Sequence, residues 1–187
     1  MLISTENWIN NFDMFSRSVN GQFSLLKSPS GGYGPDYMTA EITYNHIGTS
    51  NIIIVHQGAI RADQSVNPSD FIFEYTYNNS SNFFISFRER DFLDIFFSIK
   101  RIEIGDKEFD KRYFIKSSDK NIALEIFKDY QLKSFFMKNK SIVFNVFTKK
   151  NNTKVLLKFF ENKMYKIEEM NRAKVIFEMI LDKILST

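Results

Sequence analysis

The sequence has no cysteine among its 187 residues and only two histidines, His46 and His56. The absence of cysteine excludes disulfides, thiolate metal ligands and a cysteine nucleophile, and it fits a reducing compartment. No apolar run approaches the ~18–20 residues that a bilayer-spanning helix needs. The N-terminal residues show no basic region followed by an apolar stretch, so no signal peptide is expected. These absences predict a cytoplasmic protein without a membrane span.

The chain also lacks the short motifs that mark common enzyme classes. It contains no G-x-S-x-G, H-E-x-x-H, P-loop or G-x-G-x-x-G pattern. The glycine-rich stretch SPSGGYGPD, residues 28–36, has neither the lysine nor the following helix of a phosphate-binding loop, and it predicts a simple loop. The sequence therefore favours a non-catalytic protein without a cofactor.

What the chain does have is ample material for a core. Hydrophobic residues make up 43% of it and 21 residues are Phe, which argues against disorder. The length fits one domain, so we expect a single α+β domain over residues 1–187, with a subdivision near residue 100 as the alternative.

Alternating apolar and polar residues predict strands, most of them in hairpins. Residues 61–70 are expected to form a loop. Two further strands are expected at 22–27 and 113–116. The predicted antiparallel hairpins join residues 37–47 to 52–56, 71–77 to 83–87, and 141–149 to 154–161.

Apolar side chains at helical spacing predict helices over residues 4–17, 88–101, 117–138 and 165–185. Ser4 or Thr5 is expected to cap the first helix, and Ser117 or Ser118 the third, which we expect to break near Asp129. Because the strands come mostly as hairpins, the sequence predicts an α+β fold with a largely antiparallel sheet, rather than a doubly wound one. The predicted fold adds to this sheet an N-terminal helix, a mid-chain helix, a helix pair and a long C-terminal helix.

Charge is divided unevenly along the chain. The net charge is +3, but residues 1–99 carry −5 and residues 100–187 carry +8. Such a division either marks an acidic or nucleic-acid partner for the basic half, or reflects two halves that face each other in one fold.

The stretch from Gln131 to Phe160 contains seven lysines and no acidic residue. We expect its last hairpin to bind a protein partner with an acidic surface. Phe144, Phe147 and Phe159 are interleaved with the lysines. Nucleic acid is therefore the alternative partner, with its phosphates on the lysines and its bases stacked on these rings. The other explanation of the rings is that they are buried in the core of the sheet. The candidate partner-binding residues are Lys138, Lys140, Lys149, Lys150 and Lys154.

A small-ligand protein or a hydrolase stays open as another alternative. His46 and His56 flank the same predicted turn and are expected to approach each other across the hairpin. Glu41 or Asp63 is the candidate further ligand, but nothing in the sequence fixes either one, and no metal site is predicted. The carboxylates of residues 103–110 alternate with lysines, which fits either a catalytic pair or a solvated turn before a strand. They are Glu103, Asp106, Glu108 and Asp110.

The segment IGDKEFDKRYFIKSSDKNIALEIF resembles a pattern of an uncharacterised bacterial protein family of unknown function, in which a Gly-Asp turn precedes F-D-x-x-[FY]-x-[VI] and a Ser/Thr-Asp pair opens a helix. The resemblance covers about residues 101–184 and implies no activity; some related proteins are membrane-anchored. We interpret the motif as structural, with the two Phe in the core and Asp110 accepting backbone N–H bonds. Its residues here are Gly105, Asp106, Phe109, Asp110, Phe114 and Asp119.

Overall fold

The computed structural model describes residues 3–29, 35–46, 49–79, 83–95, 101–160 and 164–186. The loop expected at 28–36 falls partly outside these ranges. The α+β fold is confirmed. Within the described residues the elements are β1 (Ile3–Ser4), α1 (Thr5–Ser18), β2 (Gln22–Ser28), β3 (Tyr37–His46), β4 (Thr49–Ile60), β5 (Ser65–Asn78), β6 (Phe84–Glu89), the 3-10 helix η1 (Phe92–Ile95), α2 (Lys107–Arg112), β7 (Tyr113–Ser117), α3 (Lys120–Lys128), α4 (Tyr130–Lys138), β8 (Ile142–Lys149), β9 (Asn152–Phe159) and α5 (Ile167–Leu185).

The strands form one nine-stranded antiparallel sheet. Its order is β2-β3-β4-β5-β9-β8-β6-β7, and the short β1 pairs with β5. Two compact units divide the chain, and β5, β9 and α5 each give residues to both. The first unit holds Met1–Tyr75 and Lys158–Val175, and the second holds Thr76–Leu157 and Ile176–Thr187.

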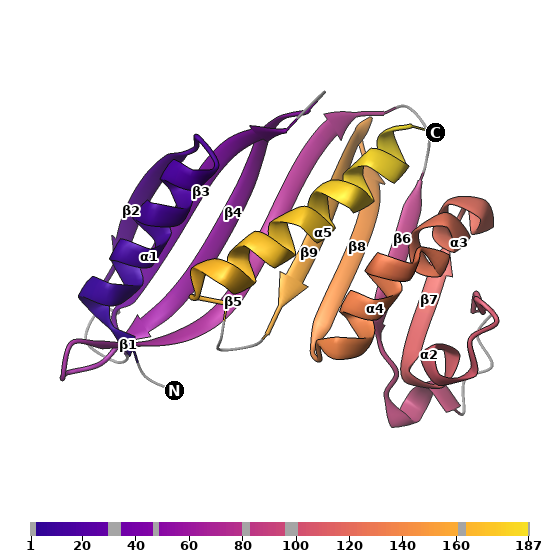
Figure 1. Ribbon diagram of the computed structural model, residues 1–187, viewed down its shortest axis with the longest axis horizontal. Coiled ribbons are helices and arrows are strands. Elements are labelled where there is room, and N and C mark those ends of the chain that lie inside the picture. Colours follow the sequence, from indigo (N-terminus) through magenta and orange to yellow (C-terminus); the bar gives the residue numbers. More distant parts are fainter. Residues whose placement is uncertain are drawn as a thin grey trace. The chain divides into compact units, whose positions relative to one another are not determined.

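In the first unit, α1 packs against β2 and β3 (Figure 1). Ser4 is its N-cap, because the Ser4 side chain accepts a hydrogen bond from the Asn7 N–H. This confirms one of the two expected caps. The buried face of α1 carries Trp8, Phe12 and Phe15, which are fully removed from solvent. Aromatic burial of this kind is a large apolar contribution to stability.

In the second unit, Phe87 of β6 is the centre of a cluster of buried rings. Its centroid lies 4.7 Å from that of Phe127 on α3 and 4.5 Å from that of Phe136 on α4. Phe109 of α2 and Tyr113 of β7 complete the cluster, at 6.1 and 4.8 Å from Phe87. These contacts place α2, α3 and α4 on the face of β6 and β7 that carries Phe87 and Tyr113 (Figure 1).

The predicted break near Asp129 is confirmed, since Asp129 ends α3 and caps α4. The cap of α3 is Asp119 rather than Ser117 or Ser118. The Asp119 carboxylate accepts from the N–H groups of Asn121 and Ile122, and a carboxylate at this position also suits the positive end of the helix dipole.

The predicted hairpin between residues 71–77 and 83–87 is wrong. β5 neighbours β4 and β9, whereas β6 lies between β8 and β7. The physical reason is the ring cluster of the second unit, because Phe87 of β6 packs there against Phe127 of α3 and Phe136 of α4. Backbone and hydroxyl groups of Ser117 and Ser118 also bind the Phe84 backbone and hold the end of β6 against β7.

Two local predictions also need correction. Residues 61–70 are not all loop, because β5 begins at Ser65. The helix predicted at 88–101 is wrong at its start, because Arg88 and Glu89 belong to β6. The Arg88 guanidinium lies 5.0 Å from the Phe114 ring centroid on β7. Only η1 is helical there, and residues 96–100 lie outside the described residues.

Candidate functional site

The two histidines do not meet. His56 on β4 lies opposite Ala40 of β3. His46 is on β3 itself, six positions after Ala40, and lies opposite Thr49 of β4. At ~3.4 Å per residue this separates them by about 20 Å. The expectation that they approach each other is therefore wrong. Among the residues that the structure describes, no group of three or more His, Asp or Glu side chains is arranged to hold a metal ion.

His56 is a core residue of the first unit, with no exposed surface. Its Nδ1 accepts a hydrogen bond of 3.1 Å from the Trp8 indole N–H, so the neutral ring carries its proton on Nε2. Burial lowers the pKa of His56 to about 3, because the charged ring would lose its hydration. A neutral, fully buried imidazole is poorly placed for acid–base work on a ligand.

The carboxylates of residues 103–110 serve the local backbone. The segment is not an extended turn, because α2 begins at Lys107 with Asp106 as its N-cap. Asp106 also accepts from the Lys133 ammonium at 2.7 Å, which holds the pKa of Asp106 below its ordinary value. Glu103 pairs with Arg101.

Asp110 binds the turn that precedes α2. Its two carboxylate oxygens accept from the N–H groups of Ile104 and Gly105, at 2.9 and 3.0 Å. Gly105 itself has a φ of +87°, which a residue with a side chain rarely adopts. Phe109 and Phe114 are both buried. Asp106 and Asp110 thus bind the backbone of this junction, and neither lines the pocket of the second unit.

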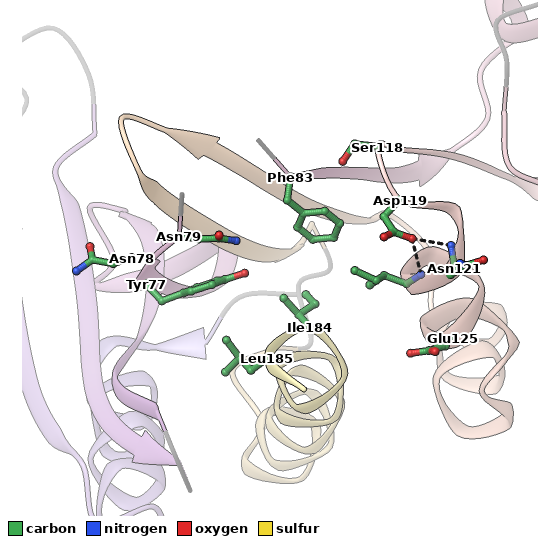
Figure 2. A pocket seen from close by; sticks show the side chains of 11 residues that line it. Tyr77, Asn78, Asn79, Phe83, Ser118, Asp119, Asn121, Glu125, Ile184 and Leu185 are labelled. Atoms are coloured by element: carbon green, nitrogen blue, oxygen red, sulfur yellow. Dashed lines mark hydrogen bonds between the residues drawn. The ribbon is translucent and has the colours of Figure 1, made fainter. Parts of the chain in front are cut away.

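A pocket of about 840 Å³ lies in the second unit. Figure 2 shows Phe83 projecting into it between Tyr77, near the end of β5, and Asp119 at the start of α3. Glu125 is the second carboxylate in its wall, and no histidine lines it. The Asp119 carboxylate is engaged in capping α3. This arrangement offers no pairing of an acid with a base.

The five candidate lysines separate into two groups. Lys138 ends α4 and Lys140 precedes β8, whereas Lys149 and Lys150 lie at the other end of β8. The eight residues from Ile142 to Lys149 span about 23 Å of strand. Lys154 is two residues into β9 and belongs to the group at the hairpin tip.

The hairpin tip is a two-residue turn with a defined shape. Lys150 and Asn151 have φ values of 50° and 64°. Positive φ at both central residues is the signature of a type I′ turn, whose twist matches that of the strands. The N–H of Asn79 donates to the Asn151 carbonyl at 2.8 Å and fixes the tip against the end of β5. Lys149 and Lys150 are exposed there.

The strands beside the tip present a second set of side chains, which we call the outward face. Along each strand these positions alternate with positions on the other side of the sheet. Phe114 is on the outward side but is buried, with the Arg88 guanidinium over its ring. The outward face consists of Phe84, Ser86 and Arg88 on β6, Phe114 and Lys116 on β7, Val143, Asn145, Phe147 and Lys149 on β8, and Asn152, Lys154 and Leu156 on β9.

Two phenylalanines of the outward face are exposed. Phe84 and Phe147 lie directly opposite each other on β6 and β8, and we call them the ring pair. Their exposed fractions are 37% and 42%. The other two rings that alternate with the lysines, Phe144 and Phe159, are buried in the core. Exposed neighbouring rings of this kind commonly mark a contact surface.

Cations accompany the ring pair. The Lys116 ammonium lies 5.9 Å from the centroid of Phe84. Lys149 follows Phe147 by two residues on the same face, and Lys154 lies on β9. In the described part of the chain, no Asp or Glu occupies an outward position on β6 to β9.

The charge of Arg88 is matched by carboxylates that follow β6. Asp94 of η1 binds its guanidinium through two hydrogen bonds of 2.6 and 2.7 Å, and the pKa of Asp94 is lowered chiefly by this contact. Asp91 adds a longer contact of 3.4 Å. Arg88 therefore contributes less to an anion site than an unpaired cation would.

Sequence reasoning missed Phe84 and Lys116. Alternation places both on a strand face, but only the pairing of β6 with β7 and β8 brings them to Phe147. Because β6 was expected to pair with β5, no signal in the sequence joined these residues to the lysines.

Among the described helices, none combines the length and the hydropathy that a transmembrane segment requires. Comparisons of the chain with protein-family models, with curated proteins and with solved structures gave no match.

Proposed function

We propose that this chain is a binding protein whose partner is a polyanionic macromolecule, and that the outward face beside the β8–β9 hairpin is its binding surface. The observation that carries the proposal is the exposed ring pair with lysines on the same face and no acidic outward residue among those described.

The charge of the second unit supports the proposal. It contains 17 basic and 12 acidic residues, whereas the first unit contains 8 and 10. The surplus of positive charge therefore belongs to the unit that carries the outward face. A surface of one sign attracts partners of the opposite sign and speeds their encounter.

The type I′ turn supports a defined position for two of the cations. It fixes the backbone of Lys149 and Lys150, whereas their side chains reach into solvent. Long flexible side chains on a rigid backbone suit contacts with a chain of repeated negative charges, which needs no single geometry.

The proposal is tested with fluorescently labelled heparin as a generic polyanion. The double variant Lys149→Glu with Lys150→Glu should weaken binding roughly tenfold or more, because each close charge pair is worth ~1 kcal/mol even in water. Lys138→Glu with Lys140→Glu is the matched control, since it makes the same charge change at the far end of β8. Fluorescence anisotropy measures both. Equal losses in the two variants, or no binding by the wild type, would contradict the proposed surface.

A further inference from the structure

We infer that the polyanion is a single-stranded nucleic acid, whose bases stack on Phe84 and Phe147 and whose phosphates lie beside the surrounding lysines. The inference rests on the proposed function, because it names the partner of the same surface.

The ring pair is what distinguishes a nucleic acid from other polyanions. Lysines alone would suit any anionic chain, but two exposed rings also offer flat apolar surfaces. Residues directly opposite in an antiparallel pair have Cβ atoms ~4.5–5.5 Å apart, so the two rings are neighbours on this face. Stacking on such rings is available to every base and depends little on sequence.

The lysines surround the rings rather than standing apart from them. Lys116 lies next to Phe84, and Lys149 and Lys154 lie on the neighbouring strands of the same face. A strand whose bases contact the ring pair would bring its phosphates within reach of these ammonium groups. Protein–nucleic acid contacts on open sheets combine rings and cations in this way.

Polar groups for the base edges follow along the same strands. Asn145 and Ser86 lie opposite each other, one outward position from the ring pair. Among the described residues, neither side chain has a hydrogen-bond partner. The Asn145 amide can both donate and accept, as can the Ser86 hydroxyl, so the two can bind Watson–Crick edges.

A single strand fits this surface better than a duplex or an acidic protein does. The bases of a duplex are stacked on one another, so their faces are hidden from the ring pair. An acidic protein supplies carboxylates but few flat groups for the rings. The outward face is therefore explained as a whole only by a partner that carries both phosphates and unpaired bases.

The test uses labelled oligouridine and oligothymidine of equal length with the full chain. Phe84→Ala and Phe147→Ala should each weaken binding about 5- to 150-fold, the range expected for loss of one stacked base. Phe147→Trp is the matched control and should retain binding, because a larger ring still stacks. Because more than half of each ring is covered, its truncation removes some packing, so circular dichroism checks that each variant is folded at the temperature of the binding measurement.

Salt dependence gives a second measurement on the same samples. For single strands, log K falls with log salt by ~0.7 for each phosphate contact. Lys149→Glu with Lys150→Glu should therefore reduce the slope by about 1.4. The two ring variants should leave the slope unchanged, because they remove stacking and no charge.

Base-free polyanions separate this inference from the proposed function. Heparin, polyglutamate and an abasic sugar–phosphate oligomer should bind more weakly than the oligonucleotides and should not respond to Phe147→Ala. Equal affinity for base-free and base-bearing chains, or tighter binding of a duplex, would overturn the inference and leave the proposed function standing. Binding of none of these probes would overturn both. Tighter binding of oligouridine than of oligothymidine would support the inference with RNA as the partner, and the reverse would support it with DNA.

Discussion

At the scale of the residue, His56 shows how burial decides what a titratable side chain does. The ring lies among Trp8, Phe12 and Phe71, with centroid distances of 5.4, 5.0 and 5.6 Å. Its Nε2 is buried without a hydrogen-bond partner among the described residues. The histidine therefore contributes apolar contacts and one acceptor to the core of the first unit, and it resists protonation.

This burial makes stability depend on pH. The pKa of His56 is lowered from 6.5 to about 3 by folding. Between these two pH values the imidazole is protonated in the unfolded chain and neutral in the folded chain. Stability contributed in this way is complete above pH 6.5 and is lost as the pH falls towards 3. We predict that the free energy of unfolding drops by about 2 kcal/mol between pH 7 and pH 5.

Urea unfolding at the two pH values measures the drop. His56→Gln keeps an acceptor for the Trp8 N–H but cannot be protonated, so its free energy of unfolding should change much less between pH 7 and pH 5. The same loss in the wild type and in His56→Gln would show that other groups cause it. His46→Gln controls for the removal of a histidine outside the core.

The motif carboxylates could be interpreted from the sequence because their work is local. An aspartate just before a helix or within a turn has backbone N–H groups within reach, whatever the rest of the fold does. Asp106, Asp110 and Asp119 all bind such groups. Whether the chain is related to the bacterial family that this motif resembles stays a prediction.

At the scale of the element, the β8–β9 turn links folding and binding. Lys150 and Asn151 both occupy the left-handed region, where a side chain other than Asn or Gly is strained by roughly 1 kcal/mol or more. Asn-Gly is the preferred pair for this turn. We predict that Lys150→Asn with Asn151→Gly raises the free energy of unfolding by about 1 kcal/mol.

Chemical denaturation measures the change, and Asn151→Ala is its counterpart, which should lower the free energy of unfolding. The stabilised variant also lacks the Lys150 charge. A loss of polyanion binding by this variant would therefore not be caused by unfolding. A variant no more stable than the wild type would contradict the assignment of a type I′ turn.

The elements themselves were largely predictable, whereas their pairing was not. Period-two alternation identified β3 and β8, and apolar spacing identified α1 and α5, because each pattern reflects one buried face. The partner of β6 was missed, since a short polar linker between two strands favours a hairpin only weakly. The contacts that decide it come from Phe127 and Phe136, some 40–50 residues later.

At the scale of the whole molecule, charge along the sequence and charge in the fold are divided differently. The sequence changes sign near residue 100, but both units draw residues from both halves of the chain. The lysines of residues 131–160 were recognisable from composition. Their separation into two groups was not, because it depends on which end of β8 each one occupies.

The candidate site follows from the pairing of three strands. Phe147 was noted in the sequence as one of three rings among lysines, with burial as the competing explanation. The structure buries Phe144 and Phe159 and exposes Phe147 opposite Phe84. Period-two alternation puts Phe144 and Phe147 on opposite faces of β8, but only the register of β8 with β6 places Phe147 opposite Phe84.

Photocrosslinking of the wild-type chain to an oligonucleotide that contains 4-thiouridine tests whether the outward face binds nucleic acid, because it locates the contact without altering the protein. After digestion, mass spectrometry identifies the crosslinked peptides. We predict that the crosslinks fall on the β6 and β8 peptides that contain Phe84 and Phe147, and that they disappear in excess unlabelled oligonucleotide. Crosslinks confined to other elements, such as α1 or the pocket between β5 and α3, would contradict the account.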